Sequence, residues 1–267
     1  MKNLVKIFGL LWISHSVYAD GLGQAPHNKE ASTHYGMHQS PRFEASVLVG
    51  GSYIPNTIEG QSLALLPYEI GPYADTFTDQ SDAGAFNWGV DAKYRFKLHK
   101  PSAQHYIFDS IGAGIGVFQI TSFDQTGNVL QFNMPEFENY TYNLNLKTTR
   151  IMADFDVDFI GIQHFIPFIE GGIGAASTTV SYDSEPIPPI SGPDFTLHDK
   201  TSWNFAYQVG AGVKYVIDTH FILSLHYLYA NMGKVDSSTS GSTTDLAAPL
   251  TVDMSTQNFL FGFTYAM

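Results

Sequence analysis

Apolar and polar side chains alternate at every second position through long stretches of this chain. From Phe259 to Met267 every second residue is aromatic or methionine, and the residues between them are mostly small. Because a β-strand points successive side chains to opposite faces, this segment predicts a strand with one bulky apolar face. Such a face fits contact with lipid, and the smaller face fits the lining of a narrow lumen.

Seven further segments carry the same alternation. The clearest is 85–98, where large apolar residues alternate with polar or small ones such as Asp91 and Lys93. In the segment 140–159 the apolar positions change phase near Lys147, which predicts a β-bulge. The eight predicted strands are Pro41–Tyr53, Ala85–Leu98, Tyr106–Thr121, Tyr140–Phe159, Phe165–Tyr182, Ser202–Val216, His220–Asn231 and Gln257–Met267.

The connections between these strands alternate in length. The short ones are His99–His105, Ile160–His164 and Ile217–Thr219, and the long ones are Ile54–Gly84, Ser122–Asn139, Ser181–Thr201 and Met232–Val252. The pattern predicts an all-β fold, an eight-stranded antiparallel up-and-down transmembrane β-barrel with short periplasmic turns and long extracellular loops. A soluble, secreted ligand-binding barrel is the alternative, but its bulky faces would point inward and its loops need not alternate in length.

The first residues have the pattern of a secretory signal peptide. Lys2 and Lys6 flank the start of a short apolar run, 7–13, and Val17-Tyr18-Ala19 precedes the predicted cleavage site. The apolar run is too short to span a bilayer as a helix. We therefore expect a signal peptide at 1–19, a flexible periplasmic segment at 20–40 and an outer-membrane β-barrel domain at 41–267.

Composition agrees with an exported membrane barrel that has no disulfide framework. The chain has 24 Gly, 20 Phe and 15 Tyr but no Cys. Its mean hydropathy is only −0.06, because strands that alternate apolar and polar residues average to neutral. Removing residues 1–19 takes away two lysines and no acids, so the formal net charge changes from −12 to −14. This charge argues against nucleic acid or anionic lipid as a partner.

Short fragments of the chain resemble the small outer-membrane β-barrel superfamily, which includes the OmpA transmembrane domain, opacity-type adhesins and OmpW-like barrels. The fragments are Pro167–Gly174 (PFIEGGIG), Trp203–Tyr215 (WNFAYQVGAGVKY) and Ile111–Gly116 (IGAGIG). The chain departs from the OmpA pattern because no peptidoglycan-binding domain follows the barrel. It also ends on Met267 instead of an aromatic residue, so Tyr265 is expected to serve in the assembly signal.

Charged residues of both signs fall on the predicted inward faces. They are Glu44, Asp91, Lys93, Arg95, Lys97, Arg150, Asp154, Asp156, Asp158, Glu170 and Lys214. Buried charges must be paired or hydrated, and eight strands leave an interior just wide enough for side chains. The favoured interpretation is a network of ion pairs that closes the lumen. A path for ions or small solutes, as the OmpW-like resemblance implies, is the alternative, and it predicts that changing Arg95, Asp154 or Glu170 alters permeability.

No catalytic, cofactor or metal site is predicted. Ser224 and His226 share one face and could form a hydrolase pair, but that face is the lumen. Their order also departs from the His-x-Ser order of small barrel-type lipid A deacylases. His34 and His38 have the spacing of a metal site on a helix, but Gly36 and the loose composition argue against a helix. Of the remaining histidines, His27 lies in the same N-terminal segment, and four cluster at the predicted short turns: His99, His105, His164 and His220.

The long loops are expected to hold the specificity of the protein. The first contains an apolar run, Ser62–Tyr73, expected to pack against neighbouring loops or to contact a ligand, and the fourth contains the polar run Asp236–Asp245, expected to be mobile. Acidic loop residues could bind divalent cations that bridge lipopolysaccharide, although no calcium-loop spacing is present; they are Asp79, Asp82, Asp183 and Glu185.

These observations predict a monomeric outer-membrane protein in contact with lipid and lipopolysaccharide. Its expected role is structural and surface-interacting, adhesin- or antigen-like, with an extracellular or host ligand bound by the loops. The alternative role is a narrow channel, and catalysis ranks third.

Overall fold

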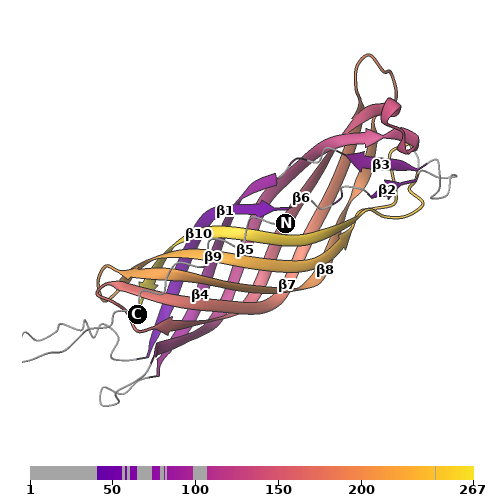
Figure 1. The fold of residues 1–267 in the computed structure, drawn as a ribbon. Coiled ribbons are helices and arrows are strands. Elements are labelled where there is room, and N and C mark those ends of the chain that lie inside the picture. Colours follow the sequence, from indigo (N-terminus) through magenta and orange to yellow (C-terminus); the bar gives the residue numbers. More distant parts are fainter. Residues whose placement is uncertain are drawn as a thin grey trace, which may run out of the picture. The chain divides into compact units, whose positions relative to one another are not determined.

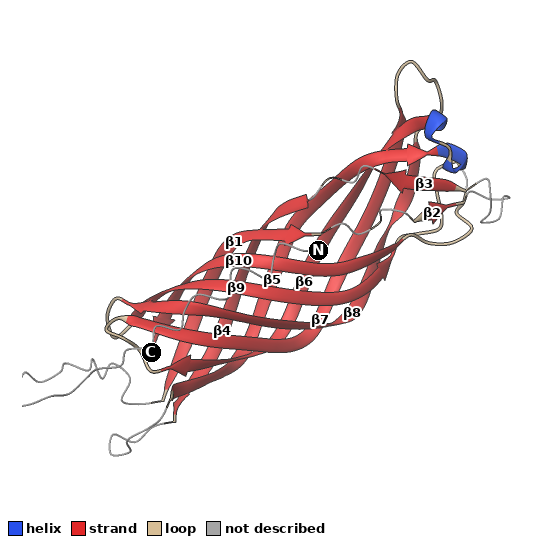
Figure 2. Cartoon of the chain, in the orientation of Figure 1, coloured by secondary structure: helices blue, strands red, loops and turns tan. Residues whose placement is uncertain are grey.

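Eight antiparallel strands close into a ring in this protein, described here by a computed structural model (Figures 1 and 2). The structure describes residues 41–267 except 56–57, 59–60, 65–73, 79–80, 82, 99–106 and 244. Around the ring the strands follow the order β1, β4, β5, β6, β7, β8, β9 and β10, and β10 pairs with β1 to complete it. The predicted fold class is therefore confirmed. The predicted signal peptide and segment 20–40 lie outside the described residues.

Four of the eight ring strands, β5 to β8, are much longer than a bilayer requires. Two short strands, β2 and β3, belong to the first extracellular loop. β4 pairs with β5 only as far as Ile120, and β3 pairs with β5 nearer its extracellular end, at Asn128 to Leu130. A transmembrane strand needs about 9–11 residues, whereas β5 has 23 and β6, β7 and β8 have 22 each. The strand bounds are β1 Arg42–Ile54, β2 Ser62–Leu63, β3 Asp75–Thr78, β4 Ala83–Lys97, β5 Phe108–Leu130, β6 Glu138–Phe159, β7 Phe165–Pro186, β8 Phe195–Val216, β9 Phe221–Asp236 and β10 Thr251–Ala266.

A band of exposed apolar side chains marks the membrane-spanning part of the ring. Phe205 on β8 is 66% exposed and Phe259 on β10 is 60% exposed, and both point away from the lumen. Exposed aromatic and aliphatic side chains of this kind occur on all eight ring strands and form the outer surface that lipid requires. At its upper limit the band includes Tyr53, Phe86, Ile151 and Trp203. No helix among the described residues is long and apolar enough to cross a bilayer.

The bulge predicted near Lys147 is present in the β5–β6 ladder, but the extra residue lies on β5 and not on β6. β6 pairs with β7 in one continuous register through Lys147, which lies opposite Thr179. The irregularity lies instead on β5, between Ile120 and Phe123. The phase of the apolar residues changes because β6 leaves the membrane here: Ile151 and Phe155 face lipid, whereas Leu144 and Leu146 face the interior.

The parts of β5–β8 on the extracellular side of Lys147 form an extension with an apolar interior (Figure 1), and its buried residues belong to a cluster that continues to Leu48 and Met152 in the barrel. Its buried residues include Phe77, Phe123, Tyr142, Leu144, Leu146, Val180, Tyr182, Leu197, Val235 and Val252. Much of what the sequence predicted as long loops is therefore strand. The connections that remain above β5–β8 are short, and the one between β5 and β6 contains two 3-10 turns, η1 Gln131–Asn133 and η2 Pro135–Phe137.

The first and fourth extracellular loops are anchored to the extension. Leu63 and Ala64 are buried in its core, so this part of the predicted apolar run packs inward, while 65–73 lies outside the described residues. The polar run of the fourth loop was expected to be mobile. In the structure this run is hydrogen-bonded to β8: the backbone N–H of His198 donates to the carbonyl of Ser240, and that of Ser242 donates to the carbonyl of Thr196.

Candidate functional site

Ion pairs cross the lumen within the membrane. Arg95 on β4 donates from Nη2 to Asp156 Oδ2 at 2.7 Å and lies 2.8 Å from both Glu44 on β1 and Asp158 on β6. From the other side, Lys214 Nζ on β8 reaches the same two aspartates at 2.7 and 2.6 Å. The network thus links β1, β4, β6 and β8 through the centre of the barrel.

Glycines on β5 make room for these carboxylates. A Cβ at Gly112 would lie 2.6 Å from Asp156 Oδ1 and 3.0 Å from Arg95 Nη2, and one at Gly116 would lie 2.6 Å from Asp154 Oδ2. Each distance is shorter than van der Waals contact permits. The Gly-x-Gly alternation of this strand therefore has a local reason, because small residues face inward where charged side chains fill the lumen.

Arg150 lies one layer above the ion pairs and is fully buried. Its Nη1 is 3.4 Å from Gln208 Oε1, its guanidinium lies 5.2 Å from the centre of the Phe118 ring, and its Nε and Nη2 have no hydrogen-bond partner within the described structure. Gln208 in turn donates to Asp154 Oδ1 at 2.7 Å. The polar atoms of this layer therefore have fewer hydrogen-bond partners than those of the ion pairs on its periplasmic side.

The lumen is filled at every level of the membrane. Above Arg150, Asn87 donates to Ser52 and to Asn258, both at 2.9 Å, and the apolar core of the extension follows. The lining residues of the charged layer are almost inaccessible to water, since Arg95 is 4% and Asp156 1% exposed. The predicted ion-pair network is confirmed for Glu44, Asp91, Lys93, Arg95, Asp156, Asp158 and Lys214. Of the other predicted charges, Glu170 pairs with His226, Asp154 and Arg150 contact Gln208, and Lys97 is half-buried at the end of β4.

Ser224, His226 and Glu170 lie in line on the inner wall. Ser224 Oγ is 2.8 Å from His226 Nε2, and His226 Nδ1 is 2.8 Å from Glu170 Oε1. These distances are those of a Ser-His-acid triad. However, Ser224 is buried and a Cβ at the facing Gly262 would collide with its Oγ, so a substrate has no space beside the hydroxyl. The backbone N–H groups of a strand ladder are also engaged, whereas an oxyanion hole needs free donors.

The outer face of the extension is a polar grid formed by three adjacent strands. Register places the outward residues of β5, β6 and β7 side by side in rows. The rows are Asn128, Thr141 and Glu185; Thr126, Asn143 and Asp183; and Asp124, Asn145 and Ser181. Neighbouring strands lie about 4.8 Å apart, so a ligand lying across the sheet can contact all three strands at once.

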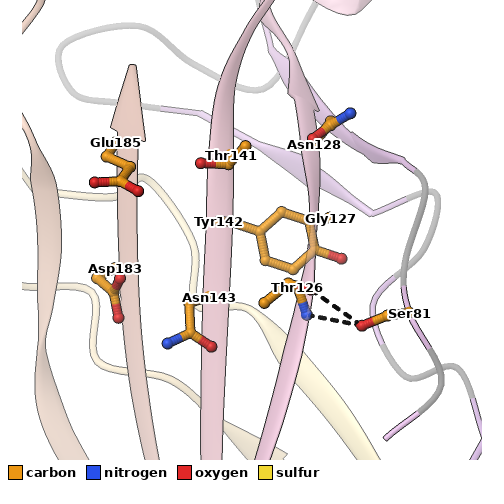
Figure 3. Close-up of a pocket in the computed structure, with 9 residues that line it drawn as sticks. All are labelled: Ser81, Thr126, Gly127, Asn128, Thr141, Tyr142, Asn143, Asp183 and Glu185. Atoms are coloured by element: carbon orange, nitrogen blue, oxygen red, sulfur yellow. Dashed lines mark hydrogen bonds between the residues drawn. The ribbon is translucent and has the colours of Figure 1, made fainter. Parts of the chain in front are cut away.

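A cavity of about 440 Å³ opens on this grid (Figure 3). It is lined by Ser81, Thr126, Gly127, Asn128, Thr141, Tyr142, Asn143, Asp183 and Glu185. Ser81 closes one side, where its hydroxyl accepts a hydrogen bond from the backbone N–H of Thr126 at 3.1 Å. Asp183 and Glu185 project from β7 on the opposite side. We call this cavity the grid pocket.

Negative charge accumulates beside the grid pocket. The pKa of Asp183 is raised above its ordinary value, first by partial burial and then by the neighbouring carboxylates of Glu185 and Asp124. Asn145 donates to Asp124 Oδ1 at 2.5 Å, which draws that carboxylate into the grid. The pocket is therefore acidic and open to the outside.

Only part of this site was anticipated. Asp183 and Glu185 were singled out from the sequence as acidic loop residues, whereas Thr126, Asn128, Thr141 and Asn143 were not. A signal was present, because Thr141, Asn143 and Asn145 alternate with Tyr142, Leu144 and Leu146. Among the described residues no group of His, Asp and Glu has an arrangement that could hold a metal ion. The other candidate residues, His27, His34, His38, Asp79, Asp82, His99 and His105, lie outside the described residues.

The two described histidines of the short turns have structural contacts. His164 Nδ1 lies 3.1 Å from the carbonyl oxygen of Val216. His220 stacks on Tyr265, with ring centres 6.0 Å apart. Both contacts tie a turn to a neighbouring strand at the periplasmic end.

Comparisons with known proteins identify the family. Residues 66–266 match the family model described as outer membrane protein beta-barrel domain. The chain is 30% identical over 123 residues to the outer membrane protein PagN of Salmonella typhimurium, which covers 45% of this chain and 50% of PagN. The match thus spans about half the length of this relative.

Solved structures of outer-membrane proteins were also found. OprG from Pseudomonas aeruginosa has a TM-score of 0.46 at 15% identity and covers 84% of this chain and 95% of its own. The protease OmpT from Escherichia coli has a TM-score of 0.39 at 12% identity, with 84% and 95% covered. The family assignment rests on the sequence match: this chain belongs to the outer-membrane β-barrel family and is a protein of the bacterial outer membrane.

Proposed function

We propose that this protein is a surface-interaction protein, in which a closed barrel anchors an extracellular β-structure that binds ligands outside the cell. The observation that carries this proposal is the contrast between a filled lumen and an elaborated exterior. The charged side chains of the lumen form ion pairs with one another, whereas the polar side chains of the outer grid point to solvent. A chain that served only to fill the membrane would not need β5–β8 to continue about ten residues beyond it.

The channel alternative has less geometric support. Conduction requires a hydrated path, and here the charged side chains that would line it are paired with one another at 2.6–2.8 Å. Above them the interior becomes apolar, which adds a dehydrated barrier to any ion. For the same reasons we propose no enzymatic role for the triad-like residues, whose serine is buried against Gly262.

Lipopolysaccharide and outer-membrane lipid are the proposed surroundings of the barrel, which we propose to be monomeric. The apolar band on the described strands accounts for the lipid contact. The ligand of the extension is proposed to be an extracellular or host molecule.

Attachment of whole bacteria tests this function. Cells that lack or express the protein are compared for attachment to epithelial cells and immobilised matrix proteins. The protein-expressing cells should attach several-fold better, and the triple variant Asn143→Ala, Asp183→Ala, Glu185→Ala should lose most of this gain. A heat-dependent gel shift and surface labelling confirm that the variant is folded and displayed. Equal attachment with and without the protein would contradict the proposal.

A further inference from the structure

The grid pocket has an unbalanced set of hydrogen-bonding groups. Its described lining contains two carboxylates, four hydroxyls and two amides, but no lysine or arginine. Carboxylates are acceptors only, whereas hydroxyls and amides can both donate and accept. The lining therefore offers more acceptors than donors.

One acceptor is already withdrawn from water. Asn143 Oδ1 is buried and has no hydrogen-bond partner within the described structure. It belongs to the middle row of the grid, between Thr126 and Asp183. A buried polar atom without a partner costs free energy. Asn143 also lines the pocket, so rotation of its side-chain amide toward a donor bound there would remove that cost.

The charges around the pocket favour a positive occupant. Asp183 and Glu185 are two residues apart on the outer face of β7, and Asp124 lies near enough to act on Asp183. Like charges at this separation repel, and a cation between them relieves the repulsion. The same field opposes sulfated or carboxylated ligands.

We infer that the grid pocket binds an ammonium or guanidinium group through Asn143, Asp183 and Glu185. The inference rests on the proposed surface function and gives its site a ligand chemistry. A volume of about 440 Å³ lies in the range of small-ligand sites and exceeds a lone ammonium. The group can come from a free polyamine or from a basic side chain on a protein.

Titration of the refolded protein in lipid nanodiscs tests the inference. The probes are spermidine for a free amine, an acetylated and amidated tri-lysine peptide for a basic protein segment, maltose as a neutral ligand and a heparin fragment as an anionic one. The side-chain amide resonance of Asn143 reports occupancy, and calorimetry gives the affinity. At least one amine should shift this resonance, and which amine binds more tightly identifies the source.

Isosteric variants separate a site from general attraction to an acidic protein. Asp183→Asn and Glu185→Gln should each weaken amine binding about tenfold. Asp253→Asn removes the same charge from an exposed carboxylate on β10, which lies opposite β6 in the ring, and should change binding less than twofold. The heat-dependent gel shift confirms that each variant is folded.

Three outcomes would overturn the inference: no amine shifts Asn143, Asp253→Asn weakens binding as much as Asp183→Asn, or heparin binds as well as the amines. Its failure differs from failure of the proposed function. If attachment of cells depends on the protein but no amine binds the grid pocket, the surface function stands and the cation site falls. If neither attachment nor amine binding is seen, both fall.

Discussion

The barrel interior within the membrane and the interior of the extracellular extension are built in opposite ways. Within the membrane, β6 points Arg150, Asp154 and Asp156 inward and apolar residues outward. Above it, the same strand points Leu144 and Leu146 inward and polar residues outward. The outer face of this one strand thus contacts lipid in the membrane and water above it. Its outward residues are apolar where they contact lipid and polar where they contact water.

The comparison explains where function can reside. In the membrane section polar groups are enclosed and can only bind one another. In the extension the polar groups are outside and can bind something else.

The largest effect is expected from the centre of the ion-pair network. Asp156→Leu removes the partner of both Arg95 and Lys214 and leaves buried positive charge, so we expect a loss of about 3–5 kcal/mol in the free energy of unfolding. Urea unfolding of the protein in detergent micelles measures it. Arg150→Met is the matched variant, and because Arg150 is incompletely bonded it should change stability by less than about 1 kcal/mol. Equal losses in the two variants would contradict the layered description of the lumen.

The apolar core of the extension gives the next effect. Leu144→Ala leaves a cavity among fully buried side chains and should cost about 2–4 kcal/mol. We expect the loss to appear as faster proteolysis of the extension, with the membrane section still resistant. If the two sections unfold together, the extension is not a separate apolar core.

A pair of lysine substitutions on β7 locates the membrane boundary. Ile173 and Thr179 point to the same outer side of this strand, but only Ile173 lies in the apolar band. Ile173→Lys should cost about 2–4 kcal/mol, whereas Thr179→Lys should cost roughly 0–1 kcal/mol. Refolding into liposomes, monitored by urea titration, measures both. A comparable cost at Thr179 would place the boundary higher on the strand.

The smallest effect concerns the titration of Asp183. Its pKa is raised, so just above the ordinary pKa of aspartate the native protein keeps a proton that the unfolded chain has lost. The contribution of this group to stability therefore falls as pH rises through that window. Glu185→Gln removes one repelling charge and should lower the pKa of Asp183, as followed by carbon NMR of its carboxyl group. An unchanged pKa would mean that Glu185 does not contribute and that burial and Asp124 raise it.

The sequence predicts the strands well where one environment governs the whole segment. The band on β10 from Phe259 to Tyr265 has lipid on one side and lumen on the other, so its alternation gives both the strand and its orientation. The strand β6 is harder to predict from the sequence, because the surroundings of its outer face change from lipid to water. A phase change caused by a new solvent looks the same in sequence as one caused by a bulge, and only the register with β7 distinguishes them.

The candidate site was less predictable for a related reason. Inward charges could be expected to meet because they share one narrow lumen. The grid pocket depends on which residues of β5, β6 and β7 lie side by side, such as Thr126, Asn143 and Asp183, and on Ser81 closing one side. Alternation within one strand carries no information about register between strands, so the row could not be derived from the sequence.

Single-channel recording of the refolded protein in a planar lipid bilayer tests the closed lumen most directly. A closed lumen predicts no steady conductance from the wild-type protein. It predicts channel openings in Arg95→Ala or Asp156→Ala, where the central ion pairs are lost. A steady wild-type conductance that changes when Arg95 or Asp154 is neutralised would contradict it and make the lumen the functional path.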